Sequence, residues 1–178
     1  MSRYRRALVP GGTWFFTVCL KDRQARTLVE RVDLLRSAIA SARKSHPFEI
    51  DAIVILPNHL HTIWTLPPGD ARFPLRWAKT KGCFSRSLAR TERRSRTDLR
   101  RGERGVWQKR YWEHLIRDDR DFEAHVDYCY FNPVKHGLAS RVRDWPYSSF
   151  HRDVAAGVYP IDWAGEAEDP GFGAGEPI

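Results

Sequence analysis

The chain is poor in the features that mark cross-linked, zinc-knuckle or membrane-spanning proteins. It has 3 cysteines among 178 residues, and Cys19, Cys83 and Cys129 are widely spaced with no C-x-x-C pair. This spacing indicates neither a disulfide framework nor a zinc knuckle, so we expect a reduced, cytoplasmic protein. The longest apolar runs, such as residues 14–20 and 52–57, are far too short to cross a bilayer. The first residues do not have the pattern of a signal peptide.

The positive charge is uneven along the chain. The formal net charge is +8, but residues 72–120 alone contain 13 Arg and 3 Lys against 6 acids, whereas residues 164–178 contain four acids and no base. A basic region of this kind is typical of a surface that binds a polyanion, because each neutralised phosphate releases condensed counterions. An ordinary solvated surface is the alternative that charge alone leaves open.

Apolar and aromatic residues are abundant enough to build a sizeable core. Hydrophobic residues make up 42% of the chain and aromatic residues 12%, which excludes a disordered or collagen-like chain. The length is close to that of one ordinary domain. We therefore expect a single domain over residues 1–163, followed by a flexible acidic tail over residues 164–178, where glycine, proline and acids predominate.

Hydrophobic periodicity predicts elements in the order strand, helix, strand, strand, helix, strand, helix. The two central strands meet at the tight Pro57-Asn58 turn, which predicts an antiparallel hairpin. Residues 91–105 predict a basic loop or a frayed helix end, and residues 145–150 an aromatic plug. The order predicts an α+β fold with helices packed on an antiparallel sheet. The predicted strands are residues 13–20, 48–56, 59–66 and 106–117, and the predicted helices are residues 33–43, 74–88 and about 118–131.

A histidine pair opens one of the predicted central strands. Residues two apart on a strand face the same side, so His59 and His61 project together while Leu60 points to the other side. Imidazole binds several divalent ions, and oxygen ligands in the remaining positions favour Mg²⁺ or Mn²⁺. The pair therefore predicts a metal site, unless these are two surface histidines that lie close by chance.

The last predicted helix carries a candidate nucleophile. If this helix extends far enough, Tyr128 and Asn132 are four residues apart and share a face, and His125 lies one turn earlier. Tyrosine is a poor nucleophile at neutral pH because its pKa is about 10. Its aryl phosphodiester is nevertheless readily reversed, as a strand-exchanging enzyme requires. A core role for this tyrosine is the alternative.

Together, the two sites resemble the REP-associated tyrosine transposases, relatives of the single-tyrosine insertion-sequence transposases in the HUH nuclease superfamily. The resemblance covers nearly everything before residue 164. One departure is Asn58, where aspartate is expected in the family. The motifs that carry the resemblance are Leu56-Pro57 followed by His59-Leu60-His61, Tyr128 followed by Asn132-Pro133-Val134-Lys135-His136-Gly137-Leu138, and residues 4–6, 11–17, 105–114 and 144–150.

The resemblance implies a ferredoxin-like HUH fold and a metal-dependent nickase and strand transferase acting on single-stranded DNA. His59 and His61 would hold Mg²⁺ or Mn²⁺, with Asn132 as a third ligand or a water-mediated contact. Tyr128 would attack the scissile phosphate and form a 5′-phosphotyrosine. The expected substrate is a repeated extragenic palindrome folded as a hairpin. The enzyme would be a monomer or a homodimer, and Tyr128 would serve its own chain or a partner.

Several residues are candidates for contacting the DNA. Lys109 and Arg110 are expected to hold the backbone, and Trp107 to stack an unpaired base unless it belongs to the core. The basic segment over residues 90–104 and the N-terminal arm are further candidates, with non-specific phosphate attraction as the alternative. The arm contributes Arg3, Arg5 and Arg6.

Two other functions remain open at this point. The same basic and aromatic residues would serve a non-catalytic regulator that binds DNA or RNA hairpins on the same fold. A metal phosphodiesterase that uses an activated water, with Tyr128 structural, would cleave without a covalent intermediate.

Overall fold

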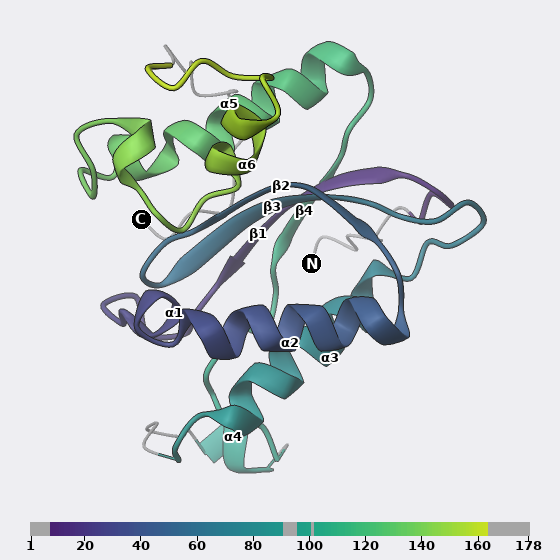
Figure 1. Ribbon diagram of the computed structural model, residues 1–178. Coiled ribbons are helices and arrows are strands. Elements are labelled where there is room, and N and C mark those ends of the chain that lie inside the picture. The colour runs from purple at the N-terminus through teal and green to yellow at the C-terminus, as the bar shows by residue number, and fades with distance from the viewer. Residues whose placement is uncertain (1–7, 91–95, 101, 164–178) are drawn as a thin grey trace, which may run out of the picture.

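The computed structural model of the protein describes residues 8–90, 96–100 and 102–163. It consists of a sheet with helices on both faces (Figure 1). The predicted N-terminal arginines Arg3, Arg5 and Arg6 and the predicted tail over residues 164–178 lie outside the described residues. Within the described part, no helix is long and apolar enough to span a membrane.

Four antiparallel strands form the sheet, in the spatial order β2-β3-β1-β4. The central strands are buried on both faces, as their continuous apolar and aromatic runs require. The pairing of β1 with β3 places Thr17 opposite His61 and Cys19 opposite His59. The strands are β1 (Thr13–Cys19), β2 (Glu49–Ile55), β3 (His59–Thr65) and β4 (Trp112–Leu115).

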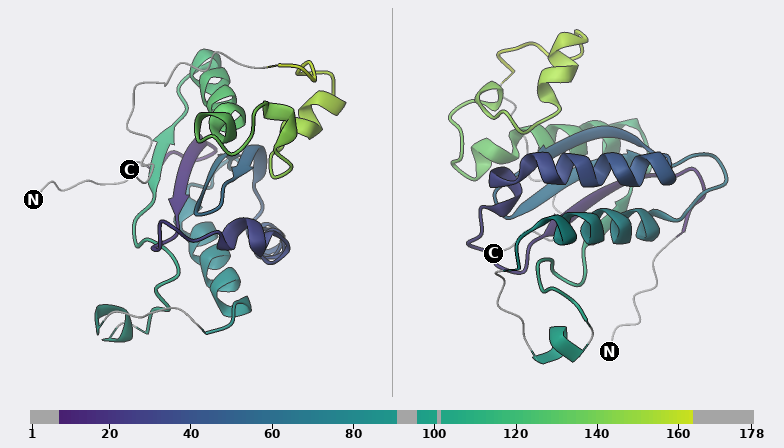
Figure 2. Two further views of the ribbon diagram at one scale, coloured as in Figure 1. Left: turned by 90° about the vertical axis from the view of Figure 1, so that its left-hand side faces the viewer. Right: turned by 60° about the horizontal axis from the view of Figure 1, so that its bottom comes forward.

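The two faces of the sheet are covered by different helices. Helices α2 (Val32–Ser45) and α3 (Phe73–Ser87) pack side by side on one face, and α5 (Asp119–Lys135) covers the other (Figures 1 and 2). The succession β1, α2, β2, β3, α3, β4 with this strand order is the ferredoxin-like arrangement. The predicted α+β class, with helices packed on an antiparallel sheet, is confirmed.

Aromatic rings fill the layer between the sheet and helices α2 and α3. Trp64 and Trp77 stack with ring centroids 4.1 Å apart, and Phe48 lies 4.2 Å from Trp64. The same layer contains a buried charge, because the Arg76 guanidinium donates to the Pro47 carbonyl oxygen at 2.6 Å and to the Asp70 carboxylate at 3.1 Å. This hydrogen bonding holds the pKa of Asp70 well below its usual range.

The prediction of one strand over residues 106–117 is wrong, because only Trp112–Leu115 forms β4. The chain first pairs with the end of β1, where Leu20 bridges Trp107 and the Gln108 amide donates to the Cys19 carbonyl oxygen. The chain then leaves the sheet and pairs with β1 again from Trp112 onward. Two further short helices are present. Helix α1 (Thr27–Glu30) lies where no element was predicted, and α4 (Arg96–Arg100) lies within the segment predicted as a basic loop or a frayed helix end.

Helix α5 begins where the sequence predicts and ends later than expected. Asp118 caps it by accepting from the Asp121 amide, as a helix start requires. The predicted end at about residue 131 is too early, because the helix continues to Lys135 with Pro133 inside it. The chain reverses at Gly137, whose φ of +65° is accessible to glycine at little cost.

The segment after α5 covers the edge of the sheet that β2 forms. The Ile55 amide donates to the Tyr147 carbonyl oxygen, the Ser149 amide donates to the Ile53 carbonyl oxygen, and the Trp145 indole donates to the Ile55 carbonyl oxygen. The predicted aromatic plug over residues 145–150 therefore pairs with β2 along its free side. It is flanked by the 3₁₀ turn η1 (Val142–Asp144) and by helix α6 (Phe150–Ala155), which was not predicted.

Candidate functional site

The predicted histidine pair lies inside the molecule, on the face of the sheet that α5 covers. The side chain of His59 is 3% exposed and that of His61 is 0% exposed, and their ring centroids are 5.0 Å apart. The alternative of two surface histidines is therefore wrong. Both imidazoles are buried and project from the same face of β3. The strand therefore fixes their positions relative to each other, as a binding site requires.

Both imidazoles are anchored through Nδ1. His59 Nδ1 lies 2.6 Å from Asn58 Oδ1, and His61 Nδ1 lies 2.9 Å from Thr17 Oγ1. The Asn58 amide nitrogen donates to the Arg23 carbonyl oxygen, so its oxygen is the atom that faces His59. His59 Nδ1 is then the proton donor, and its Nε2 carries the lone pair.

Burial keeps both rings neutral. The pKa of His59 is lowered to about 3, mainly by desolvation and also by the neighbouring His136 and Lys135. Burial also places the pKa of His61 well below its ordinary value, against the opposing effect of a hydrogen bond with Asn132. Neutral imidazole is the form that binds a metal, so no proton has to be displaced from Nε2 near neutral pH.

Tyr128 and Asn132 lie one helical turn apart on α5 and face the histidine pair, as predicted. The Tyr128 ring centroid is 5.2 Å from that of His61, and both Tyr128 and Asn132 are buried. Among the described residues, the Tyr128 hydroxyl has no hydrogen-bond partner. A buried hydroxyl without a partner is costly for stability, which is unusual for a purely structural tyrosine.

Two residues at the end of α5 add positive charge and a third imidazole. The Lys135 ammonium lies 4.9 Å from the centroid of the Tyr128 ring. The His136 ring centroid is 5.3 Å from that of His59, and both Lys135 and His136 are exposed. A cation beside an otherwise neutral group of side chains favours binding of an anion such as a phosphate.

The donor set fits a divalent cation. Within the described part of the chain, His59 Nε2 is buried without a hydrogen-bond partner, and the Asn132 side chain lies in hydrogen-bonding contact with His61. Two neutral imidazole nitrogens and an amide oxygen leave positions for phosphate and water oxygens. These are the side chains that would hold the ion.

A second group of metal-ligating atoms lies beside this site. Ligand atoms of His114, Asp121 and His125 all lie within 4.8 Å of one another. His114 is on β4, Asp121 and His125 are on α5, and both α5 residues are buried. This group was not predicted, although His114 and Asp121 are separated by only six residues in the sequence.

The predicted DNA contacts lie on the long connection before β4. Lys109 and Arg110 are exposed. Trp107 is half-buried against Phe84, with ring centroids 5.4 Å apart, and its indole donates to the Lys81 carbonyl oxygen. These contacts favour the alternative in which Trp107 belongs to the core and does not stack on an unpaired base.

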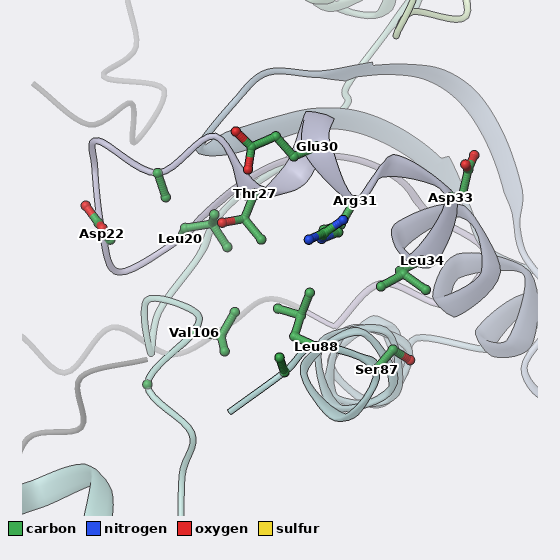
Figure 3. Close-up of a pocket in the computed structure, with 13 residues that line it drawn as sticks. Leu20, Asp22, Thr27, Glu30, Arg31, Asp33, Leu34, Ser87, Leu88 and Val106 are labelled. Atoms are coloured by element: carbon green, nitrogen blue, oxygen red, sulfur yellow. The ribbon is translucent and has the colours of Figure 1, made fainter. Parts of the chain in front are cut away.

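A pocket of about 860 Å³ lies between α1, the start of α2 and the end of α3 (Figure 3). Its lining includes the acidic side chains of Asp22, Glu30 and Asp33, with Arg31 among them. None of the lining residues is a histidine or a tyrosine. Carboxylates repel a polyanion, so this pocket is a poor candidate for the DNA site.

The chain has relatives among known proteins that match it over nearly its whole length. The chain is 49% identical over 178 residues to the REP-associated tyrosine transposase of Escherichia coli K12, covering 100% of this chain and 99% of that protein. It is 47% identical over 169 residues to a putative REP-associated tyrosine transposase of Haemophilus influenzae, covering 94% of this chain and 96% of the relative. No sequence-family model matches the chain.

A solved structure has the same fold. The structure of a REP-associated tyrosine transposase bound to a REP hairpin superposes with a TM-score of 0.86 at 49% identity, covering 100% of this chain and 99% of the other. This similarity in sequence and fold, over the full length of the chain, identifies a DNA-processing enzyme. The chain belongs to the REP-associated tyrosine transposases.

Proposed function

We propose that this transposase nicks single-stranded DNA beside a palindromic hairpin and carries the cut end on Tyr128. The observation that carries the proposal is the 5.2 Å contact between the Tyr128 and His61 rings, in a site where both imidazoles are neutral and anchored. The similar protein solved with a REP hairpin supports the choice of substrate.

Each side chain then has one task. His59, His61 and Asn132 hold Mg²⁺ or Mn²⁺, which supplies neutralisation of the developing charge on the scissile phosphate. The Tyr128 oxygen forms a bond to phosphorus while the bond from phosphorus to the 3′ oxygen breaks. The phenol releases its proton and the leaving 3′ oxygen takes one up, which leaves a 5′-phosphotyrosine and a free 3′-hydroxyl. Attack by a second 3′-hydroxyl reverses the step without an external energy source.

The packing of Tyr128 supports catalysis within one chain. Tyr128 lies against His61 of the same chain, and the Phe15 ring contacts both, at 5.6 Å from His61 and 5.9 Å from Tyr128. A monomer therefore brings the nucleophile and the proposed metal ligands together. Lys109 and Arg110 are proposed to hold the DNA backbone from the exposed connection before β4.

The direct test is the covalent adduct. A hairpin oligonucleotide labelled at its 3′ end is incubated with the protein and Mn²⁺ and resolved under denaturing conditions. We expect an adduct with the wild type and none with Tyr128→Phe. Because the Tyr128 hydroxyl has no hydrogen-bond partner among the described residues, this variant should fold as well as the wild type.

The matched control is Tyr130→Phe. Tyr130 is also buried on α5, but its hydroxyl bonds to Ser149 and Asp153, away from the histidines. This variant should still form the adduct. Adduct formation by Tyr128→Phe would remove Tyr128 from the proposed role. Tight hairpin binding that survives EDTA, with no cleavage by the wild type, would favour the non-catalytic regulator.

A further inference from the structure

Asp121 is the centre of a hydrogen-bonded network at the start of α5. Its carboxylate accepts from His114 Nε2 at 2.9 Å, from the Arg117 amide at 3.0 Å and from Arg117 Nε at 3.3 Å. His125 Nδ1 lies 3.1 Å from the other carboxylate oxygen and donates to the Asp121 carbonyl oxygen at 2.6 Å. Burial alone would raise the pKa of Asp121, but the hydrogen bonds from His114 and Arg117 outweigh it and lower the pKa.

These contacts indicate that the network holds β4 and α5 together and is not a metal site. The carboxylate already accepts from three nitrogen donors, one of them the Arg117 guanidinium. A divalent cation here would have to displace these donors and would lie beside a fixed positive charge. The network instead joins β4, through His114, to the first two turns of α5.

A row of rings connects this network with the proposed active site. The His114 and His125 rings stack at 4.7 Å, and His125 lies 4.7 Å from Phe15. Phe15 is fully buried, and its ring is stacked at 5.6 Å on His61 and meets Tyr128 edge-on at 5.9 Å. Phe15 on β1 is also paired directly with His114 on β4.

The row sets where α5 lies along the sheet. His125 and Tyr128 are three residues apart on one helix face, and both rest on the Phe15 ring. A shift of His125 along that ring therefore moves Tyr128 relative to His61. In-line attack tolerates little misplacement, since an error of about 1 Å can cost about 100-fold in rate.

We propose that His114, Asp121 and His125 are positioning residues that, acting through Phe15, fix Tyr128 against His61. The inference rests on the proposed function, because it explains how the nucleophile is aligned. None of the three touches the reacting atoms. Their effect falls on the alignment of the nucleophile and leaves hairpin binding unchanged.

The test separates ring packing from hydrogen bonding. Rates of adduct formation are measured with saturating hairpin and Mn²⁺, at a fixed interval below the Tm of each variant. We expect His125→Leu to slow adduct formation by at least about 10-fold, and His125→Phe, which keeps a ring on Phe15, to recover most of the rate. Asp121→Asn should also slow it by about 10-fold, with hairpin affinity unchanged.

The matched control is Asp118→Ala. Asp118 caps the same helix end by accepting from the backbone amide of Asp121, whereas His114, Arg117 and His125 contact the Asp121 carboxylate. This variant should therefore lower the Tm and leave the rate unchanged. If Asp118→Ala slows the reaction as much as Asp121→Asn, the network is merely structural and the proposal fails. A second Mn²⁺ per chain that is lost in Asp121→Asn and kept in a variant lacking His59 and His61 would identify a metal site instead.

A readout without catalysis distinguishes failure of the inference from failure of the proposed function. Nuclear Overhauser contacts between the Tyr128 and His61 rings should be present in the wild type and in His125→Phe, and lost in His125→Leu. Their persistence in His125→Leu would overturn the positioning role whatever the activity. Absence of any wild-type adduct, with these contacts changing as expected, would overturn only the proposed function.

Discussion

The two faces of the sheet use the same kinds of residue for opposite purposes. On the face covered by α2 and α3, aromatic rings such as Trp64 and Trp77 pack against one another, and the buried Arg76 is neutralised by Asp70. On the face covered by α5, the buried rings include His59, His61 and Tyr128, and the Tyr128 hydroxyl has no hydrogen-bond partner among the described residues. The first face stabilises the fold, whereas the second keeps a buried hydroxyl at a cost in stability, as expected if it holds the proposed reactive groups.

The largest expected effect is on the chemistry of the α5 face. Replacing both His59 and His61 by alanine should lower the rate of adduct formation by about 10³-fold, because the metal supplies several kcal/mol of charge stabilisation. Hairpin affinity should change little. Gel quantification of the adduct and a binding titration measure the two quantities, and an unchanged rate would contradict the assignment of the ligands.

The opposite face should show the reverse pattern. Trp77→Ala removes a ring that stacks on Trp64 and contacts Phe16 at 5.5 Å, so it should lower the free energy of unfolding by about 3–5 kcal/mol. The rate of adduct formation per folded molecule should be unchanged. Denaturant titration and the adduct assay measure the two effects. A slower reaction per folded molecule at low temperature would contradict a purely stabilising role for this face.

The buried charge on the stabilising face gives a smaller, pH-dependent effect. Asp70→Asn weakens the pairing of Arg76, so we expect a loss of about 2 kcal/mol, less than for a fully buried pair because Asp70 is partly exposed. The folded state lowers the pKa of Asp70, so the wild-type advantage is complete above pH 3.8 and declines as the pH falls below that value. Unfolding curves at pH 7 and pH 3 should show the gap narrowing. Arg72→Ala, which removes an exposed partner of Asp70, is the control with little effect.

The smallest effect concerns the anchoring of one ligand. Asn58→Ala removes the acceptor that fixes His59 Nδ1, and it should weaken Mn²⁺ binding by about 10-fold with little change in Tm. Asn58→Asp should retain the affinity, because a carboxylate accepts the same hydrogen bond. Calorimetric titration of Mn²⁺ measures both, and equal affinity in Asn58→Ala would show that β3 alone orients the ring.

The sequence predicts the local parts of this architecture well. The apolar patterns of β1 and β3, the Pro57-Asn58 turn and the start of α5 are short-range signals, and each appears in the structure where expected. The pairing of Tyr128 with Asn132 follows from helical spacing. The late end of α5 was missed because proline usually ends a helix, since it lacks an amide donor and clashes with the preceding turn, whereas α5 continues two residues beyond Pro133.

Features that depend on contacts between distant segments were not predictable in the same way. The stacking of His125 on Phe15 joins residues far apart in sequence, and only the register of β1 with β4 brings Phe15 opposite His114. The role of Asn58 was also missed, because a turn residue has no periodicity to mark it. Only the position of Asn58 directly before the histidine pair could have suggested a supporting role.

The closed outer edge of the sheet restricts how copies of this chain can associate. The residues that follow α5 already occupy hydrogen-bonding groups of β2, through Tyr147, Ser149 and Trp145. A neighbouring molecule cannot add a strand there without first peeling this segment away. A dimer built by continuing the sheet across two copies at β2 is therefore disfavoured, and the same segment shields the strand from aggregation.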